Sequence, residues 1–161
     1  MEDLDPVQRV EEFISKHGIV ARIEILEPES ARTSLLASQA LGCSIAEIAK
    51  TIVFMNHENS EPILVILSGD KKVNLEKLAG QIATTASALR KMTANEVKEQ
   101  TGYAIGGVPP FPHKVGTRVF ADNSLFRFES IWAAAGGSNA VVQLKPSVFI
   151  QLGIPQIDAS E

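Results

Sequence analysis

The stretch "TIVFMNHENSEPILVIL", residues 51–67, contains two apolar runs separated by a polar segment. Residues 51–55 and 63–67 are rich in β-branched and aliphatic side chains, which favours strands. The residues between them, Asn56 to Pro62, are polar and include a proline, as is typical of a turn. The stretch therefore predicts two apolar strands joined by a turn, and the other elements can be placed around them.

Helix start signals recur on both sides of this pair. Asp5-Pro6-Val7-Gln8 has an N-cap residue, a proline at the first helical position and a glutamine at the third. Ser44–Glu47 and Thr93–Glu96 are further capping boxes. The Ser44–Glu47 box predicts a helix that ends at Lys50, directly before the first apolar strand. Helices are expected over residues 5–17, 33–41, 44–50, 74–79, 93–101 and 146–152.

The remaining strands are expected over residues 19–25, 115–121, 130–135 and 140–144, and the last two flank a glycine-rich turn at 136–139. Strands and short helices alternate without a regular βαβ rhythm, which indicates a mixed α+β fold. The 161 residues contain no repeat, linker or low-complexity segment. We therefore expect one domain over residues 1–161.

Composition excludes several classes of protein. The net charge of −4 argues against a protein that coats nucleic acid non-specifically, although a local basic patch could still bind one RNA end. The single cysteine, Cys43, rules out an intrachain disulfide framework and is typical of the cytoplasm. No apolar run approaches the ~18 residues of a membrane span, and the N-terminus lacks a signal-peptide pattern, so no membrane association is expected.

Most catalytic motifs are missing. His17, His57 and His113 are far apart in the sequence, and with one cysteine a metal site is not expected. The chain has no G-x-G-x-x-G dinucleotide fingerprint and no G-x-S-x-G nucleophile turn. No metal and no organic cofactor is therefore expected.

One loop has an unusual composition. "GYAIGGVPPFPHK", residues 102–114, combines two adjacent glycines with three prolines. Glycine permits close approach of another group and proline fixes the backbone, so the loop can hold its amides toward a ligand or can simply be a tight turn. Lys50 is also placed between two elements, either to bind a ligand or as a solvated lysine that complements a helix dipole.

Three separated motifs, in order, resemble the YbaK/EbsC family of aminoacyl-tRNA editing domains. They are "AEIAKTIVF" at 46–54, "TGYAIGGVPPF" at 101–111 and "ADNSLFRFESIWAAAGGSNAVVQL" at 121–144. The resemblance covers roughly residues 33–152 and also relates the chain to the domain inserted in bacterial prolyl-tRNA synthetases. It implies a barrel-like β-sheet flanked by helices.

The resemblance also implies an activity and a site. The activity is that of a free-standing deacylase, which hydrolyses the ester joining a wrong, small amino acid to the 3′-terminal adenosine of tRNA. Lys50 would anchor the terminal phosphate or ribose, and the Gly106 and Gly107 amides would bind the oxyanion. Water or a group of the substrate would attack, without a cofactor. Aminoacyl-tRNA is the expected partner, with an aminoacyl-tRNA synthetase as a second candidate.

Further residues are expected to contact substrate, each with a structural alternative. Pro110 would brace the loop. The other four are Tyr103, His113, Ser138 and Asn139. Tyr103 could equally be packed, His113 could be a solvated loop residue, and Ser138 and Asn139 suit a hairpin turn. Many family members have Ser-Pro-Phe-Gly where this chain has Pro109-Pro110-Phe111-Pro112, which removes two amides and predicts a stiffer loop.

Two questions stay open at the level of sequence. Six cations could form a patch for the acceptor stem or could be scattered solvated charges: Lys71, Lys72, Arg90, Lys91, Lys114 and Arg118. A non-catalytic module that binds an aminoacyl end, a nucleotide or a peptide is an alternative function, and a scaffold with a purely structural loop is another.

Overall fold

The computed structural model describes residues 4–161, and all structural statements below concern these residues. The α-helices are α1 (Pro6–Lys16), α2 (Ser34–Leu41), α3 (Leu75–Gln81), α4 (Ala94–Thr101) and α5 (Ser147–Gln151). The strands are β1 (Ala21–Ile25), β2 (Ala49–Asn56), β3 (Glu61–Ser68), β4 (Leu89–Lys91), β5 (Arg118–Asp122), β6 (Ile131–Ala134), β7 (Ala140–Leu144) and β8 (Gln156–Ile157). Short 3₁₀ helices span Pro28–Ala31, Ile45–Glu47, Ala86–Ala88 and Asn123–Arg127.

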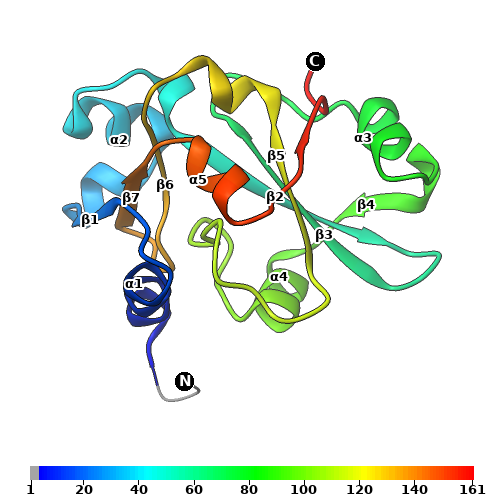
Figure 1. The fold of residues 1–161 in the computed structure, drawn as a ribbon, viewed down its shortest axis with the longest axis horizontal. Helices are drawn as coiled ribbons and strands as arrows, with labels where there is room; N and C mark the ends of the chain where they lie inside the picture. Colours follow the sequence, from blue (N-terminus) through cyan, green and yellow to red (C-terminus); the bar gives the residue numbers. More distant parts are fainter. Residues whose placement is uncertain (1–3) are drawn as a thin grey trace.

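The two apolar runs form the central hairpin of the larger sheet. β2 and β3 pair antiparallel over their whole length, from Ala49 opposite Ser68 to Asn56 opposite Glu61. The sheet has the order β4-β2-β3-β5-β8, and β5 runs parallel to both β3 and β8. In Figure 1 the long β2–β3 hairpin crosses the molecule toward α3 and β4. The prediction of two paired strands around a polar turn is confirmed.

The second sheet is smaller and lies at the other end of the molecule (Figure 1). Its order is β1-β7-β6, all antiparallel, and the predicted hairpin around residues 136–139 joins β6 to β7. One isolated parallel bridge, between Ile48 and Trp132, links β6 to the start of β2. The mixed α+β class is therefore confirmed. The barrel-like sheet is not confirmed, because the described strands form two sheets and neither closes into a barrel.

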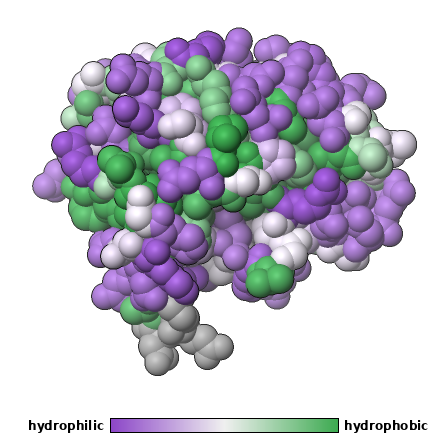
Figure 2. All heavy atoms as spheres, in the orientation of Figure 1, coloured by the Kyte–Doolittle hydropathy of each residue, from purple (hydrophilic) through white to green (hydrophobic). Residues whose placement is uncertain are grey.

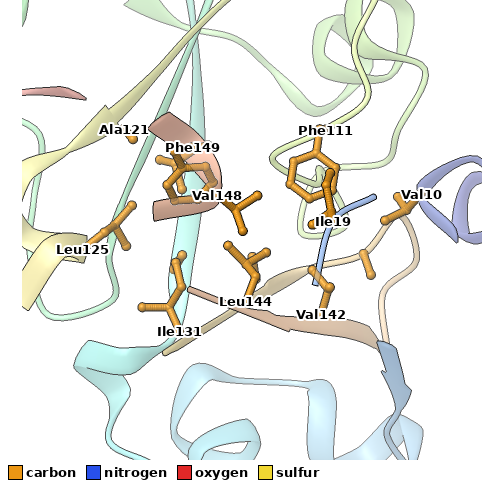
Figure 3. Packing of buried hydrophobic residues seen from close by; sticks show 14 of the residues in the cluster. Val10, Ile19, Phe111, Ala121, Leu125, Ile131, Val142, Leu144, Val148 and Phe149 are labelled. Carbon is orange, nitrogen blue, oxygen red and sulfur yellow. The ribbon is translucent and has the colours of Figure 1, made fainter. Parts of the chain in front are cut away.

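The main hydrophobic core lies between the sheets, beneath α5 and α1. Phe149 of α5 is fully buried and packs in one cluster with Leu125 and Ile131 (Figure 3). At the other side of the same cluster Phe111, from the proline loop, lies near Val10 of α1. The proline loop is thus attached to the core by an aromatic side chain.

Alternate residues of β2 face two further clusters. Phe54 packs with Leu78 of α3, whereas Val53 packs with Val97 of α4 and with Tyr103. This alternation follows from the two-residue period of a strand. The larger sheet is therefore covered by α3 on one face and by α4 and the proline loop on the other.

The helix signals are mostly confirmed. The Asp5–Gln8 and Thr93–Glu96 capping boxes begin α1 and α4, and Gly42 ends α2 in the left-handed conformation. The helix predicted over residues 44–50 is too long. Its capping box is present, but the 3₁₀ helix ends at Glu47, Ile48 is extended, and Lys50 is the second residue of β2. Pairing of this segment with β3 outweighs its helical pattern.

Hydrophilic residues cover most of the face shown in Figure 2, and apolar residues gather over the β1–β7 end. Several apolar side chains are well exposed, including Val20, Ile25 and Ile105. Within residues 4–161, no helix has both the length and the apolar character that crossing a membrane requires.

Candidate functional site

A cavity of about 370 Å³ lies where the two sheets separate. It is lined by the start of β2, the β6–β7 hairpin, the N-terminal part of α2 and the loop that follows α4. Beyond the bridge at Ile48 and Trp132, β6 no longer pairs with β2, and the cavity opens beside this gap. The topology, rather than one loop, therefore creates the site.

The wall that β2 contributes is an unpaired strand edge. β4 pairs only with residues 54–56, and the Met92 N–H donates to the Val53 carbonyl at 2.9 Å. The backbone groups of Val53 thus face the β4 side, and alternation along the strand turns those of Thr51 to the same side. In the described part of the chain no strand continues beside Thr51 there, and Thr51 lines the cavity.

Lys50 lines the same cavity and is half-buried. Burial lowers the pKa of its ammonium group, the positive charge of Lys91 lowers it further, and Asp70 opposes the shift. None of the six ion pairs found among residues 4–161 includes Lys50. A cation in this position, without a carboxylate partner, is suited to bind an anionic or carbonyl-bearing ligand.

The two glycines of the loop differ from each other. Gly106 lines the cavity, has a φ of +86° and is exposed. Gly107 is buried, and its N–H donates to the Ala104 carbonyl at 2.9 Å. The Gly107 carbonyl accepts from the N–H of Gly136 at 3.0 Å. The Gly107 amide thus already closes a turn, whereas the role predicted for it needs this amide to bind the oxyanion of a substrate.

The two predicted hairpin residues, Ser138 and Asn139, have different surroundings. Ser138 lines the cavity, where its hydroxyl is available to a ligand. The side-chain amide of Asn139 instead donates to the Leu26 carbonyl at 2.8 Å, and the Leu26 N–H donates back to the backbone carbonyl of Asn139. Asn139 thus fastens the hairpin to the end of β1. Of the predicted site residues, Lys50, Gly106 and Ser138 share one cavity.

Tyr103, Pro110 and His113 belong to the loop but do not line this cavity. The Tyr103 hydroxyl donates to the Pro112 carbonyl at 3.0 Å, and His113 Nε2–H donates to the Pro109 carbonyl at 2.7 Å. The two rings meet edge to face, with centroids 5.7 Å apart. Pro110 and His113 line a different cavity beside α1. These residues are therefore placed to hold the loop rather than to reach a ligand at Lys50.

Some cations of the candidate basic patch form ion pairs, whereas others act on Lys50. Arg90 makes a two-pronged ion pair with Glu96, at 2.8 and 2.7 Å, and Arg118 pairs with Glu61 at 3.1 Å. Lys91 and Lys72 act on the pKa of Lys50, which they lower. Within the candidate patch, Lys91 and Lys72 are thus the cations that act on Lys50.

Two features of the site could not be found from sequence motifs. The free backbone of Thr51 depends on where β4 ends, and a strand of three residues leaves little periodic signal. Arg32 lines the cavity from the end of the 3₁₀ helix Pro28–Ala31, directly after its last residue, and pairs with Glu29 at 2.9 Å. Arg32 belongs to a short turn segment, and no sequence motif there marks it as a site residue.

Few kinds of reactive side chain line the cavity. Lys50 and Arg32 are the titratable side chains among its lining residues, and Thr33, Ser34, Thr51 and Ser138 supply hydroxyls. The lining includes no carboxylate, thiol or imidazole. Within residues 4–161 no three acidic, cysteine or histidine side chains cluster as metal ligands would. The cavity can bind and polarise an ester, and attack would come from water or from the ligand itself.

Comparison with known proteins places the chain in a family. The model of the aminoacyl-tRNA editing domain matches residues 28–152. An uncharacterized protein of Bacillus subtilis, YwhH, is 33% identical over 80% of this chain and 79% of its own length. The multifunctional Ser/Thr-tRNA deacylase ProXp-y of Escherichia coli K12 is 28% identical over 93% of this chain and 89% of its own. A solved structure of a proposed trans-editing enzyme for prolyl-tRNA synthetase superposes with a TM-score of 0.86, at 30% identity over 99% of both chains. The chain belongs to the aminoacyl-tRNA editing domain family.

Proposed function

We propose that the protein is an aminoacyl-tRNA deacylase, which hydrolyses the ester between a small, wrongly attached amino acid and the 3′-terminal adenosine of tRNA. The observation that carries the proposal is the joint presence of Lys50 and the free edge of β2 in one cavity whose lining has no thiol, and no imidazole or carboxylate to activate a hydroxyl. The family and the E. coli deacylase relative support the same reaction. We also propose a cytoplasmic location, which the tRNA substrate and the single cysteine support.

Lys50 anchors the substrate in this proposal. Its ammonium binds the terminal phosphate or ribose oxygens and fixes the ester against β2. No carboxylate among the lining residues competes for this charge. The lysine therefore contributes by positioning the ester, and positioning alone can lower an activation barrier by several kcal/mol.

The oxyanion is bound by backbone N–H groups. The N–H of Thr51 faces the cavity edge without a strand partner in the described structure, and the Gly106 N–H belongs to the exposed part of the loop. Attack by water, or by a hydroxyl or thiol of the substrate, gives a tetrahedral oxyanion that these donors stabilise. The carbon–oxygen ester bond then breaks, and the 3′ oxygen of the ribose takes up a proton.

Small residues make up much of the cavity lining. Six alanines contribute to its surface: Ala31, Ala37, Ala49, Ala133, Ala134 and Ala140. Alanine side chains leave the backbone accessible to a bound ester and add no charge that would repel an amino acid. Small amino acids are the proposed substrates, and the serine and threonine in the name of the E. coli relative belong to this class.

A deacylation panel tests the function. Several aminoacyl-tRNAs with small side chains are incubated with the protein, each on its cognate and on a mismatched tRNA, with uncharged tRNA as competitor. The proposal predicts release of free amino acid from at least one mismatched pair, well above the rate of spontaneous hydrolysis. Release at the spontaneous rate from every ester would contradict it.

The same panel separates the alternative of a non-catalytic binding module. A module that only binds the aminoacyl end would shield the ester, so the ester would hydrolyse more slowly than in buffer. Competition by uncharged tRNA would then reduce the protection. The deacylase predicts the opposite sign, since the protein shortens the lifetime of the ester.

A further inference from the structure

A second, smaller cavity of about 120 Å³ lies beside the Lys50 cavity. The two share the lining residues Thr51, Ile52, Ile105 and Val108. The smaller cavity, called here the side cavity, extends along the edge of β2 to the point where β4 ends and α4 begins. A ligand that lies against Thr51 in the main cavity can therefore reach into the side cavity without crossing the protein.

The walls of the side cavity are mostly apolar. Met92 and Val97 line it and are both buried, and Ile105, which is 60% exposed, stands at the boundary with the main cavity. Lys91 is the one charged residue among those that line it. An apolar slot with a single cation is suited to a flat ring that carries a phosphate.

Lys91 is available to bind that phosphate. It lies opposite Phe54 in the β4–β2 pair, so strand alternation places it on the same face of the sheet as Lys50. Its neighbour Arg90 is engaged by Glu96, whereas Lys91 is exposed and belongs to none of the ion pairs found in residues 4–161. Lys50 of β2 and Lys91 of β4 thus present two positive charges on one face of the sheet, and neither belongs to an ion pair found in residues 4–161.

We propose that the side cavity binds the base of the terminal nucleotide, and that Lys91 contacts the 5′ phosphate of that nucleotide. This inference rests on the proposed function, which places the ester carbonyl at Thr51. The base and the ester are attached to the same ribose, so the base must lie within one sugar of Thr51. The side cavity meets this condition because Thr51 lines it as well.

Binding of 5′-AMP to the whole protein tests the inference without relying on catalysis. Methyl resonances of Met92 and Val97 report occupancy of the side cavity during a titration with 5′-AMP. We expect saturable shifts of both, and an affinity about tenfold weaker for adenosine and for ribose 5-phosphate, since each lacks one of the two contacts. Unchanged Met92 and Val97 resonances would overturn the assignment.

Lys91→Ala provides the matched variant, because the residue is exposed and its loss leaves the pairing of β4 intact. The variant should bind 5′-AMP no better than the wild type binds adenosine. Lys16→Ala, which removes an exposed lysine of α1, should bind 5′-AMP as the wild type does. Equal 5′-AMP affinity of Lys91→Ala and wild type would overturn the role of Lys91.

The outcome is separable from that of the proposed function. If aminoacyl esters are hydrolysed and 5′-AMP does not shift Met92 or Val97, this inference fails and the deacylase stands. If 5′-AMP binds there in a Lys91-dependent manner and no ester is hydrolysed, the nucleotide site stands and the deacylase fails.

Discussion

The N–H of Gly136 donates a hydrogen bond to the carbonyl of Gly107 at 3.0 Å, so the two glycine-rich segments bind each other. A β-carbon on Gly107 would lie 3.3 Å from the carbonyl carbon of Gly137. The absence of a side chain at Gly107 thus allows the loop and the hairpin to approach. Both segments line the Lys50 cavity, and their contact fixes one of its corners.

Gly107→Ala should mainly reduce stability. The added methyl group needs shifts of a few tenths of an ångström against the hairpin, which predicts a loss of about 1 kcal/mol in the free energy of unfolding. The deacylation rate per folded molecule should stay within a few-fold of the wild type, because the Gly107 amide is already bonded to Ala104. Denaturant unfolding and single-turnover rates on one preparation measure both. A hundredfold rate loss at unchanged stability would contradict this prediction and would indicate that the Gly107 N–H binds the oxyanion.

Gly106→Ala and Gly153→Ala form a matched pair. Both glycines have positive φ, +86° and +75°, and an added β-carbon meets no atom within 4 Å at either. Each substitution should therefore destabilise the protein by about 1 kcal/mol through the backbone alone. Only Gly106 lines the cavity, so only Gly106→Ala should also lower the deacylation rate. Equal activity of the two variants would show that the Gly106 backbone does not contribute to catalysis.

Thr51→Pro tests the backbone donor on β2. Proline removes the N–H, and an edge strand tolerates it where that N–H has no partner. The lost donor predicts a fall of about a hundredfold in the single-turnover rate. Thr51→Val is the control, since it removes the hydroxyl and keeps the N–H, and it should retain most activity.

Thermal unfolding must accompany the Thr51 rates. Similar midpoints for the two variants would attribute the rate difference to the N–H. If Thr51→Pro does not fold, the Thr51 amide resonance of the wild type still reports the contact, because a non-hydrolysable amide analogue of aminoacyl-adenosine should shift it. Full activity of a folded Thr51→Pro, or an amide resonance unmoved by the analogue, would exclude this donor.

His113 makes stability depend on pH. Burial lowers the pKa of its imidazole, which the hydrogen bond from Nε2–H to the Pro109 carbonyl partly offsets, and Nδ1 is buried without a partner. The folded pKa lies below the unfolded value of 6.5, so the unfolded state binds more protons as pH falls below 6.5. The free energy of unfolding should therefore decrease from pH 6.5 downward and be constant with respect to this group above it.

His113→Gln isolates that contribution, because glutamine can still donate to the Pro109 carbonyl and does not titrate. Thermal midpoints of wild type and variant between pH 8 and pH 5 give the comparison. The midpoint of the wild type should fall more steeply below pH 6.5 than that of the variant. Parallel curves would show that His113 is protonated without cost in the folded protein.

Local signals predicted the parts of the fold that local physics determines. The Thr93–Glu96 capping box begins α4, Gly102 ends it in the left-handed conformation, and the 51–67 stretch forms β2 and β3. Lys50, which its motif predicted as a site residue, lines the cavity, whereas the helix predicted to end at Lys50 stops at Glu47. The helical pattern of residues 44–50 gives way to strand pairing with Leu67, a contact that the local sequence does not contain.

Long-range contacts account for the remainder. β8 has two residues and is held by the buried Asp122, whose carboxylate accepts from the Ala159 N–H at 2.8 Å, and no period of two can appear in so short a strand. The role of Tyr103 depends on a bond to Pro112 across the loop. The free edge at Thr51 depends on where two other strands stop. Such features follow from the assembled fold.

The single-turnover deacylation rate of Lys50→Ala, measured with the thermal midpoint, tests the central claim most directly. The substrate is the aminoacyl-tRNA that the wild type hydrolyses fastest, and Lys16→Ala, which removes an exposed lysine of α1, is the control for loss of a positive charge. Lys50 is half-buried and outside every ion pair found in residues 4–161, so its loss should change the midpoint little. The account predicts a rate reduced by about a hundredfold or more, with the fold retained. A folded Lys50→Ala that deacylates at the rate of the wild type would contradict it and place the reaction elsewhere on the molecule.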